Sequence, residues 1–320
     1  MRGPGTSPVQ ERKNPGPIRA WARLARFPFH SVGLMPFALG TALAWKAEQV
    51  FRPGVFLCGA AGVVAVMLAT YLAGELHDRK EDALAAVSGR TRFSGGSGVL
   101  VAGLVPEKSV RTAVLASLAA AAAVGLVLVF GYGTGPLTIP LGALGVICGY
   151  FYSTPPPRWV SRGIGEVMIG FCYGWLPVAV SCYLMTGRIA PEVTWISVPV
   201  GLTIFNVILI NEFPDFEADR AAGKKNLTVR LGPARAARLY IAVALLALLS
   251  LLYDLTRLGF PPSAFIAVAP VVVIGLAAIR MVLSSGWKER GRLERLCGLT
   301  LLLNLSVSAA LILLIWIFRA

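Results

Sequence analysis

Two short stretches contain half of the acidic residues in this sequence. The first reads GELHDRKED at residues 74–82 and the second reads NEFPDFEAD at residues 211–219. Hard divalent cations prefer carboxylate oxygens, and Mg²⁺ typically binds one or two carboxylates together with phosphates of a ligand. The repeated pattern therefore predicts a site where a diphosphate is held through Mg²⁺. The patterned carboxylates are Glu75, Asp78 and Asp82 in the first stretch, and Glu212, Asp215 and Asp219 in the second.

A basic loop containing glycine lies next to each acidic stretch. RTRFSGGSG covers residues 90–98, and DRAAGKKNLTVRLG covers residues 219–232. Cationic side chains in these loops are suited to neutralise phosphate oxygens that metal ions do not reach. Positive charge in such loops also has a purely topological explanation, because retained loops of membrane proteins collect Lys and Arg. The candidate phosphate contacts are Arg92, Arg220, Lys224, Lys225 and Arg230.

The elements that position these residues are membrane-spanning helices. The 320 residues are 56% apolar and only 14% charged, far from the composition of a soluble domain. A spanning helix needs about 20 mainly apolar residues, so the sequence predicts an all-α, multi-pass membrane protein with about nine spans. The uncharged candidates lie near 27–45, 55–74, 113–130, 137–152, 167–185, 194–210, 239–253, 264–279 and 296–318.

The distribution of basic residues predicts the orientation of these spans. With residues 1–26 as a basic cytoplasmic tail and nine spans, 25 of the 30 Lys and Arg residues fall on one face. That face is the cytoplasmic one by the positive-inside rule. Both acidic stretches leave the membrane there, because four crossings separate them. The net charge of +14 is then explained by topology and anionic membrane lipid, and no nucleic-acid-binding motif accompanies it.

Local spacing predicts how each acidic stretch is presented. Offsets of three and seven residues fall on one stripe of a helix, so Glu75, Asp78 and Asp82 are expected on one face that continues the second span. In the second stretch, Pro214 cannot donate a backbone hydrogen bond and fits poorly inside a helix. A broken or kinked helix end is expected there.

The sequence resembles the UbiA-type intramembrane prenyltransferases. Their two Asp-rich motifs, N-x-x-x-D-x-x-x-D after helix two and D-x-x-x-D after helix six, are similar to 74–82 and 211–219 in spacing and order. Within the family, INEFPDFEADRAAGKKNLTVRLG looks most like the 1,4-dihydroxy-2-naphthoate, or menaquinone-pathway, branch. RFPFHSVGLMPFALGTALA at 26–44 and YFYSTPPPRWVSRGIGE at 150–166 also resemble that branch.

The resemblance implies a fold and a reaction. It implies one domain over residues 27–320, with nine helices around a central cavity, and Mg²⁺-dependent transfer of a prenyl group from polyprenyl diphosphate to an aromatic quinone precursor. The acceptor it favours is 1,4-dihydroxy-2-naphthoate, with 4-hydroxybenzoate or another acceptor as the alternative. It also implies a bacterial or archaeal cell membrane with the active site facing the cytoplasm. The implied catalytic and metal-binding residues are Asp78, Asp82, Asp215 and Asp219.

One position departs from the family pattern. The first motif usually opens with Asn, and this sequence has Gly74 there. Because glycine cannot contribute a side-chain amide to metal or phosphate, either Glu75 or Asn211, which opens the second motif, is expected to compensate, or the diphosphate is expected to bind somewhat differently.

Several other residues are candidates for substrate contact. Tyr150 and Tyr152 are placed to stack on an allylic cation, although interfacial anchoring explains them as well. Arg158 and Arg162 are suited to orient the acceptor, with Arg162 pairing with Glu166 as the alternative. Asn206 is a polar residue within an apolar span, where either a functional role or an interhelical hydrogen bond is expected.

The sequence disfavours two other classes of membrane protein. A transporter can use carboxylates as an ion site, but such sites usually lie near the bilayer midplane, whereas these acids fall at one edge and the candidate spans carry none. A phosphatidyl-alcohol transferase needs one compact block, D-G-x-x-A-R followed by G-x-x-x-D-x-x-x-D, which the sequence lacks. The five cysteines have no C-x-x-C spacing and are expected to be packing residues.

Overall fold

The computed structural model describes residues 16–88, 91, 93 and 96–318. Within these residues the chain is helical, and no strand occurs. The expected all-α class is confirmed. The α-helices are α1 Gly16–Ala25, α2 Ser31–Glu48, α3 Pro53–His77, α4 Arg79–Ser88, α5 Glu107–Leu126, α6 Thr138–Ser153, α7 Gly165–Gly170, α8 Leu176–Thr186, α9 Glu192–Asn211, α10 Phe216–Ala222, α11 Leu227–Leu231, α12 Pro233–Arg257, α13 Ser263–Leu283 and α14 Arg290–Ile317. Short 3-10 turns occupy Phe27–His30, Trp159–Ser161 and Gly286–Lys288, and π-helical turns occupy Val127–Gly131 and Phe171–Trp175.

The long helices account for the predicted membrane spans. Eight helical segments of the described chain are long and apolar enough to cross a membrane, and α6 is a ninth, shorter apolar helix of 16 residues. At 1.5 Å per residue, α6 is about 24 Å long, which is less than the roughly 30 Å of a typical hydrocarbon core. The expectation of about nine spans is consistent with this set.

Contacts at both ends show that α6 runs the length of the bundle. At its carboxyl end, Ser153 donates a hydrogen bond to Asp78, which follows α3. At the other end, Arg52, just before α3, bonds the carbonyl of Tyr132, six residues before α6 begins. The chain therefore returns through α6 to the end of the bundle where the first acidic stretch lies.

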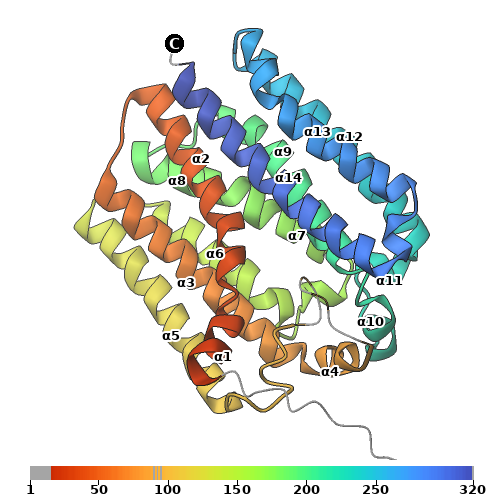
Figure 1. Cartoon of the computed structure of the whole chain (residues 1–320). Coiled ribbons are helices and arrows are strands. Elements are labelled where there is room, and N and C mark those ends of the chain that lie inside the picture. The colour runs from red at the N-terminus through yellow and green to blue at the C-terminus, as the bar shows by residue number, and fades with distance from the viewer. Residues whose placement is uncertain (1–15, 89–90, 92, 94–95, 319–320) are drawn as a thin grey trace, which may run out of the picture.

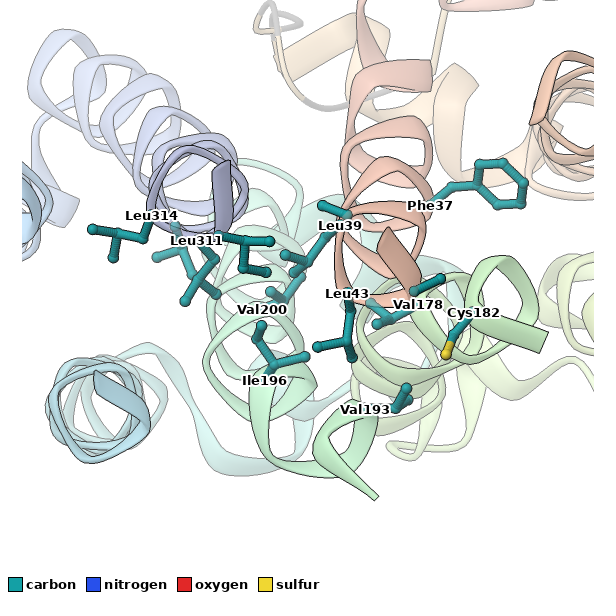
Figure 2. Close-up of a cluster of buried hydrophobic side chains, with 14 of the residues drawn as sticks. Phe37, Leu39, Leu43, Val178, Cys182, Val193, Ile196, Val200, Leu311 and Leu314 are labelled. Atoms are coloured by element: carbon teal, nitrogen blue, oxygen red, sulfur yellow. The ribbon is translucent and has the colours of Figure 1, made fainter. Parts of the chain in front are cut away.

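The main core lies among α2, α8, α9 and α14 (Figure 2). Phe37 and Leu39 of α2, Val178 of α8 and Val200 of α9 are fully buried there, with Leu311 of α14. Because lipid is as apolar as these side chains, close packing is the main source of stability between membrane helices. This cluster therefore fixes the frame on which the polar end of the bundle is built.

Glycines allow the π-helical turn at 171–175 to approach α9 closely. A Cβ on Gly174 would lie 2.5 Å from Cα of Gly201, and a Cβ on Gly201 would lie 2.9 Å from the carbonyl oxygen of Gly170. Such small-residue contacts bring helix backbones together. The contact fixes the segment that carries Tyr173 into the interior, and π-helical turns often occur at functional sites.

Both acidic stretches lie at one end of the bundle. Figure 1 shows α4 and α10 side by side there, and the two helices are in contact. The C-terminal end of α14 lies at the opposite end of the molecule (Figure 1). Two segments that are distant in the sequence therefore lie at the same end of the bundle, as the even number of crossings between them requires, and the structure brings them into contact.

The local presentation of the acidic stretches was predicted correctly for one and wrongly for the other. The second helix ends at Asn211 and restarts at Phe216, so the expected break at Pro214 is confirmed. The first helix ends at His77, and Asp78 lies between α3 and α4. The expected single face, which assumed an unbroken helix, is therefore wrong.

The end of the segment predicted as a cytoplasmic tail forms helix α1. Leu24 is fully buried in it, in a cluster with Leu72 and Ala73 of α3. The domain boundary near residue 26 stays a prediction.

Candidate active site

A polar pocket of about 220 Å³ lies at the end of the bundle where α4 and α10 meet. All four aspartates of the predicted metal site line it. Their side chains come from four different places: the α3–α4 junction, α4, the turn before α10, and α10 itself. Among the polar residues lining the pocket are Asp78, Asp82, Asp215, Asp219, Asn211, Glu212, Lys224, Arg26, Glu81, Ser153, Tyr71, Tyr152 and Tyr173.

Asp78 is held by two donors from the segment at and after the end of α6. Ser153 donates to Asp78 Oδ2 at 2.9 Å, and the Arg158 guanidinium donates to Asp78 Oδ1 at 2.9 Å. Arg158 also bonds Glu81 at 2.7 Å and the carbonyl of His77 at 3.2 Å. The predicted candidate Arg158 therefore organises the first acidic stretch, and it does so at the edge of the pocket.

Asp219 is held by residues of the basic loop that follows it. Asn226 donates to Asp219 Oδ2 at 2.7 Å, and Lys224 Nζ lies 3.4 Å from Asp219 Oδ1. Burial alone would lower the pKa of Lys224, but Asp78, Asp219 and Asp215 raise it above its ordinary value. Lys224 thus stays protonated between the two acidic stretches, where it can also pair with a phosphate.

Burial, together with neighbouring carboxyl groups, raises the pKa of two of the four aspartates. Burial, with Glu75 and Asp78 nearby, raises the pKa of Asp82 to about 8. Burial also raises the pKa of Asp219 to about 6, despite the opposing effect of Lys224. Carboxylates that are desolvated beside like charges are stabilised by a neighbouring cation.

The donor set of the pocket fits Mg²⁺, which prefers several carboxylate oxygens and retains other ligands for phosphate and water. In the described residues, no three His, Cys, Asp or Glu side chains are close enough to hold one ion in the present arrangement. In this arrangement, Arg158, Ser153, Asn226 and Lys224 engage two of the carboxylates. Asp78, Asp82, Asp215 and Asp219 would be the residues that hold the metal after exchanging these partners.

Glu75 does not line the pocket. It is 3% exposed, pairs with Arg26 at 2.9 Å, and accepts hydrogen bonds from Ser97 N–H at 2.6 Å and Ser97 Oγ at 2.7 Å. It therefore holds Arg26 and the loop after α4 in place. A Cβ on Gly96 in that loop would overlap the carboxylate of Asp82, so the loop passes directly over this residue.

The structure separates the other predicted contacts into two groups. Asn211 and Lys224 line the pocket, whereas five predicted contacts do not line it. Asn206 is buried and donates to the Tyr240 carbonyl at 3.0 Å, which is an interhelical hydrogen bond. Arg162 is exposed and bonds the carbonyls of Pro156 and Pro157, and no contact with Glu166 is found. The remaining three are Tyr150, which packs against the cluster that contains Leu24 and Leu72, and the exposed Arg220 and Lys225.

The remaining basic-loop candidates are Arg230 and Arg92. Arg230 is exposed and bonds the carbonyl of Lys225 at 2.7 Å, so it stabilises its own loop. Arg92 lies outside the described residues.

Some pocket residues were missed in the sequence. Arg26 was assigned to the tail, although a basic residue directly before a span, on the side of the acidic stretches, was a signal for it. Ser153 and Tyr71 carried no pattern of their own. Tyr152 was not missed, because it was predicted together with Tyr150. It lines the pocket and Tyr150 does not, since residues two apart point to different sides of a helix.

An apolar cavity of about 510 Å³ adjoins the polar pocket. The two share Thr70, Tyr152, Ile169 and Tyr173 in their linings. The cavity extends from there between α3, α5, α6 and α8, and its α6 wall includes Gly142, a glycine whose added Cβ would meet no atom. A ligand with a polar head and a long apolar tail matches this pair of compartments.

One expectation about charges within the spans is wrong. Helix α12 extends to Arg257 and includes Asp254, which is 1% exposed, and Glu166 is 1% exposed in the first turn of α7. Both lay just outside the sequence ranges chosen as uncharged. The helices therefore extend beyond the predicted ranges at these ends and include two buried carboxyl groups.

The fold and the pocket together define an integral-membrane helical protein with a carboxylate-rich site at one end of its bundle. The chain belongs to the UbiA prenyltransferase family, whose profile matches residues 33–295. The family assignment made from the sequence is confirmed.

Relatives in this family are named as prenyl-transferring enzymes. A 1,4-dihydroxy-2-naphthoate octaprenyltransferase of Bacillus subtilis (strain 168) is 27% identical over 206 residues, which are 63% of this chain and 62% of the relative. The enzyme of the same name from Escherichia coli (strain K12) is 25% identical over 80% of this chain and 83% of its own length. A 2-carboxy-1,4-naphthoquinone phytyltransferase of Synechocystis is 24% identical over 71% of each chain. The chain thus spans about three fifths of the Bacillus relative.

Solved structures share the fold at low identity. The apo structure of a UbiA homolog from Aeropyrum pernix K1 has a TM-score of 0.65 at 20% identity and covers 89% of this chain and 98% of that chain. A UbiA homolog from Archaeoglobus fulgidus, bound to GPP and Mg²⁺, has a TM-score of 0.62 at 16% identity and covers 91% of this chain and 99% of that chain. These likenesses establish the fold.

Proposed function

We propose that this protein transfers a polyprenyl group from polyprenyl diphosphate to an aromatic quinone precursor in a Mg²⁺-dependent reaction. The observation that carries the proposal is the continuity between the aspartate-lined pocket and the apolar cavity. A polyprenyl diphosphate has the matching two parts, since a multiply charged head is joined to a long apolar tail.

The head of the donor belongs in the polar pocket. Lys224 supplies a positive charge among the aspartates, and Arg158 supplies another at the edge of the pocket. Bound Mg²⁺ would act as a Lewis acid that offsets the charge on the departing pyrophosphate. Preorganised cations of this kind stabilise charge that develops in the transition state.

The tail of the donor belongs in the apolar cavity, which also protects the reaction from water. When the C–O bond to diphosphate breaks, the electron pair leaves with pyrophosphate and an allylic cation remains. Tyr152 and Tyr173 lie at the junction of the two compartments, where aromatic faces can stabilise a cation. Exclusion of water favours attack by an aromatic ring over quenching.

The acceptor we infer is 1,4-dihydroxy-2-naphthoate, as in menaquinone biosynthesis. Support comes from the relatives that are named for naphthoate or naphthoquinone substrates. In this reaction a ring carbon forms the new C–C bond to the prenyl group, the carboxylate leaves as CO₂, and the ring recovers its aromaticity. The family assignment favours this enzyme class over a membrane transporter that uses the carboxylates as an ion site.

The setting we propose is a bacterial or archaeal cell membrane, with the pocket open to the cytoplasm and the spans surrounded by lipid. The 25 basic residues that the nine-span topology places on one face support this orientation.

A transfer assay in membranes tests the proposal. Labelled polyprenyl diphosphate is offered with 1,4-dihydroxy-2-naphthoate, with 4-hydroxybenzoate or without acceptor, each with and without Mg²⁺. We expect a prenylated product with the naphthoate only when Mg²⁺ is present. Product with 4-hydroxybenzoate alone would replace the acceptor and keep the reaction, and no product with either acceptor would reject it.

A further inference from the structure

Two buried carboxyl groups lie against each other beside the second acidic stretch. Glu166 is in the first turn of α7 and is 1% exposed, and Glu212 directly follows α9 and is 8% exposed. Glu166 Oε1 accepts a hydrogen bond from Leu227 N–H at 2.8 Å, and Glu212 Oε2 accepts one from Thr228 N–H at 3.1 Å. Two carboxyl groups from different helices thus hold consecutive amides of one segment.

The two carboxyl groups also lie close to each other. Burial, together with the Glu166 carboxyl group, raises the pKa of Glu212 well above its ordinary value. The second oxygen of Glu166, Oε2, is buried and has no hydrogen-bond donor among the described residues. The hydrogen bonds that this pair accepts from the described residues come from two backbone amides.

The segment held by this pair carries a residue that donates a hydrogen bond to Asp219. Asn226 precedes Leu227 directly and is fully buried. Its Nδ2 donates to Asp219 Oδ2 at 2.7 Å, and its Oδ1 accepts from Val229 N–H at 2.9 Å. Both functions of the amide are used, which fixes its orientation. Displacing residues 227 and 228 would displace Asn226 with them.

We propose that Glu166 is a positioning residue for the second acidic stretch. Together with Glu212 it holds the amides of residues 227 and 228, which fixes Asn226 against Asp219 and so presets that carboxylate for a divalent cation. The inference rests on the proposed function in one respect, because it takes Asp219 as a metal-binding residue. Groups that orient metal-binding side chains typically change metal affinity by about 10- to 100-fold when removed.

Binding of Mn²⁺ to the purified full-length protein in detergent micelles, followed by electron paramagnetic resonance without substrate, tests this role. Glu166→Gln keeps an oxygen for Leu227 N–H and gains an NH₂ group that can donate to Glu212, so we expect Mn²⁺ affinity close to that of the wild type. Glu166→Ala removes both contacts, and we expect affinity to fall about 10-fold. Glu192→Ala, which removes an exposed acid at the other end of α9, is the matched control and should change nothing.

The outcomes separate positioning from general stability. A lower melting temperature for Glu166→Ala with unchanged Mn²⁺ affinity would assign a structural role only and overturn the proposal. If that variant does not fold, Glu166→Asp, which is one methylene too short to reach both partners, takes its place with the same criterion. A wild-type protein that binds no Mn²⁺ would also overturn it. Mn²⁺ binding that follows the expected order, with no prenyl transfer by the wild type, would keep the positioning role and reject the reaction.

Discussion

At the scale of single residues, the aspartates of the pocket are held by different partners. Asp78 is fixed by Arg158 and Ser153, whereas Asp219 is fixed by Asn226 and Lys224. Each of these two carboxylates therefore has a cation beside it before any metal binds. If a divalent ion were bound by these carboxylates, Arg158 and Lys224 would be close enough to pair with phosphate oxygens of a bound ligand.

Removing the charge of one aspartate tests its assignment as a metal-binding residue. We expect Asp215→Asn to lower kcat/KM for prenyl transfer by at least about 100-fold, because metal-assisted charge neutralisation is worth several kcal/mol in the transition state. The isosteric amide should leave the amount of folded protein nearly unchanged.

The control for this substitution is Glu217→Gln, an exposed acid in the neighbouring helix α10. It should retain wild-type activity. Steady-state assays over a range of Mg²⁺ concentrations make the comparison, and full activity of Asp215→Asn would contradict the metal assignment.

The raised pKa values of Asp82 and Asp219 predict how stability depends on pH. Their values of about 8 and about 6 lie above the ordinary 3.8. At pH values between the ordinary pKa of 3.8 and these raised values, the folded protein holds protons that the unfolded chain releases. The free energy of unfolding therefore falls as pH rises. We expect the melting temperature of the metal-free protein in detergent to decrease from about pH 5 to about pH 8.

Two comparisons check the origin of this slope. Asp82→Asn removes the group with the higher pKa, so the decrease should become shallower between about pH 6 and about pH 8. Added Mg²⁺ should raise the melting temperature most at the alkaline end, where the carboxylates are ionised. A slope that is the same in Asp82→Asn would show that other groups cause it.

The sequence predicted which acids gather, but not how each one is used. Spacing and crossing number were sufficient to bring Asp78, Asp82, Asp215 and Asp219 into one pocket. Glu75 was placed on the same face because the helix was assumed to continue, and the chain instead turns at Asp78. The roles of Asn226 and Glu166 depend on contacts between distant segments, which spacing along one chain does not encode.

At the scale of elements, α6 joins the two compartments of the site. Its carboxyl end carries Ser153 at the polar pocket, and its middle lines the apolar cavity with Gly142, Gly145 and Gly149. These three glycines fall on one face of the helix at offsets of three and seven. At Gly142 the missing side chain leaves open space, whereas at Gly149 it allows Thr70 of α3 to approach closely.

Filling this room should shorten the donor that the protein accepts. A Cβ on Gly142 would meet no atom, so Gly142→Leu is expected to fold and to extend into the cavity. Because it blocks only the far part of the compartment, we expect kcat/KM for long-chain polyprenyl diphosphates to fall about 10-fold relative to a short-chain donor, which corresponds to about 1.4 kcal/mol.

The matched control is Gly291→Leu, at an equally open glycine in the first turn of α14. It should leave the ratio between long and short donors unchanged. The measurement is the product distribution from a mixture of donors of different length. An unchanged ratio in Gly142→Leu would show that the tail lies elsewhere.

At the scale of the whole molecule, hydropathy was sufficient to predict the helical class and about nine spans, because the apolar segments are separated by stretches that contain charged residues or turn-forming Gly and Pro. The boundaries were less predictable. Helix α6 is short for a span, and Asp254 lies inside α12 although it lay just beyond a predicted range. Packing against neighbouring helices, which the sequence pattern does not report, shields Asp254 from lipid.

The orientation of the molecule gives the last prediction. The end that carries α4 and α10 is expected in the cytoplasm, because the topology that places both acidic stretches on one face also gives that face 25 of the 30 basic residues. Glu217, exposed on α10, then faces the cytoplasm, and Arg188, exposed between α8 and α9, faces the opposite side. Labelling of Glu217→Cys and Arg188→Cys with a membrane-impermeant maleimide distinguishes the two faces in intact cells and in inverted vesicles.

The native cysteines lie within the helical bundle and serve as the background to be subtracted with unsubstituted protein. We expect Glu217→Cys to react only in inverted vesicles and Arg188→Cys only in intact cells. The reverse pattern would place the aspartate pocket on the outer face and remove its access to cytoplasmic diphosphates and Mg²⁺. Reaction of both variants from the same side would contradict the predicted alternation of the spans. Helix α6, as the shortest of them, would then be the first candidate for a helix that does not cross the membrane.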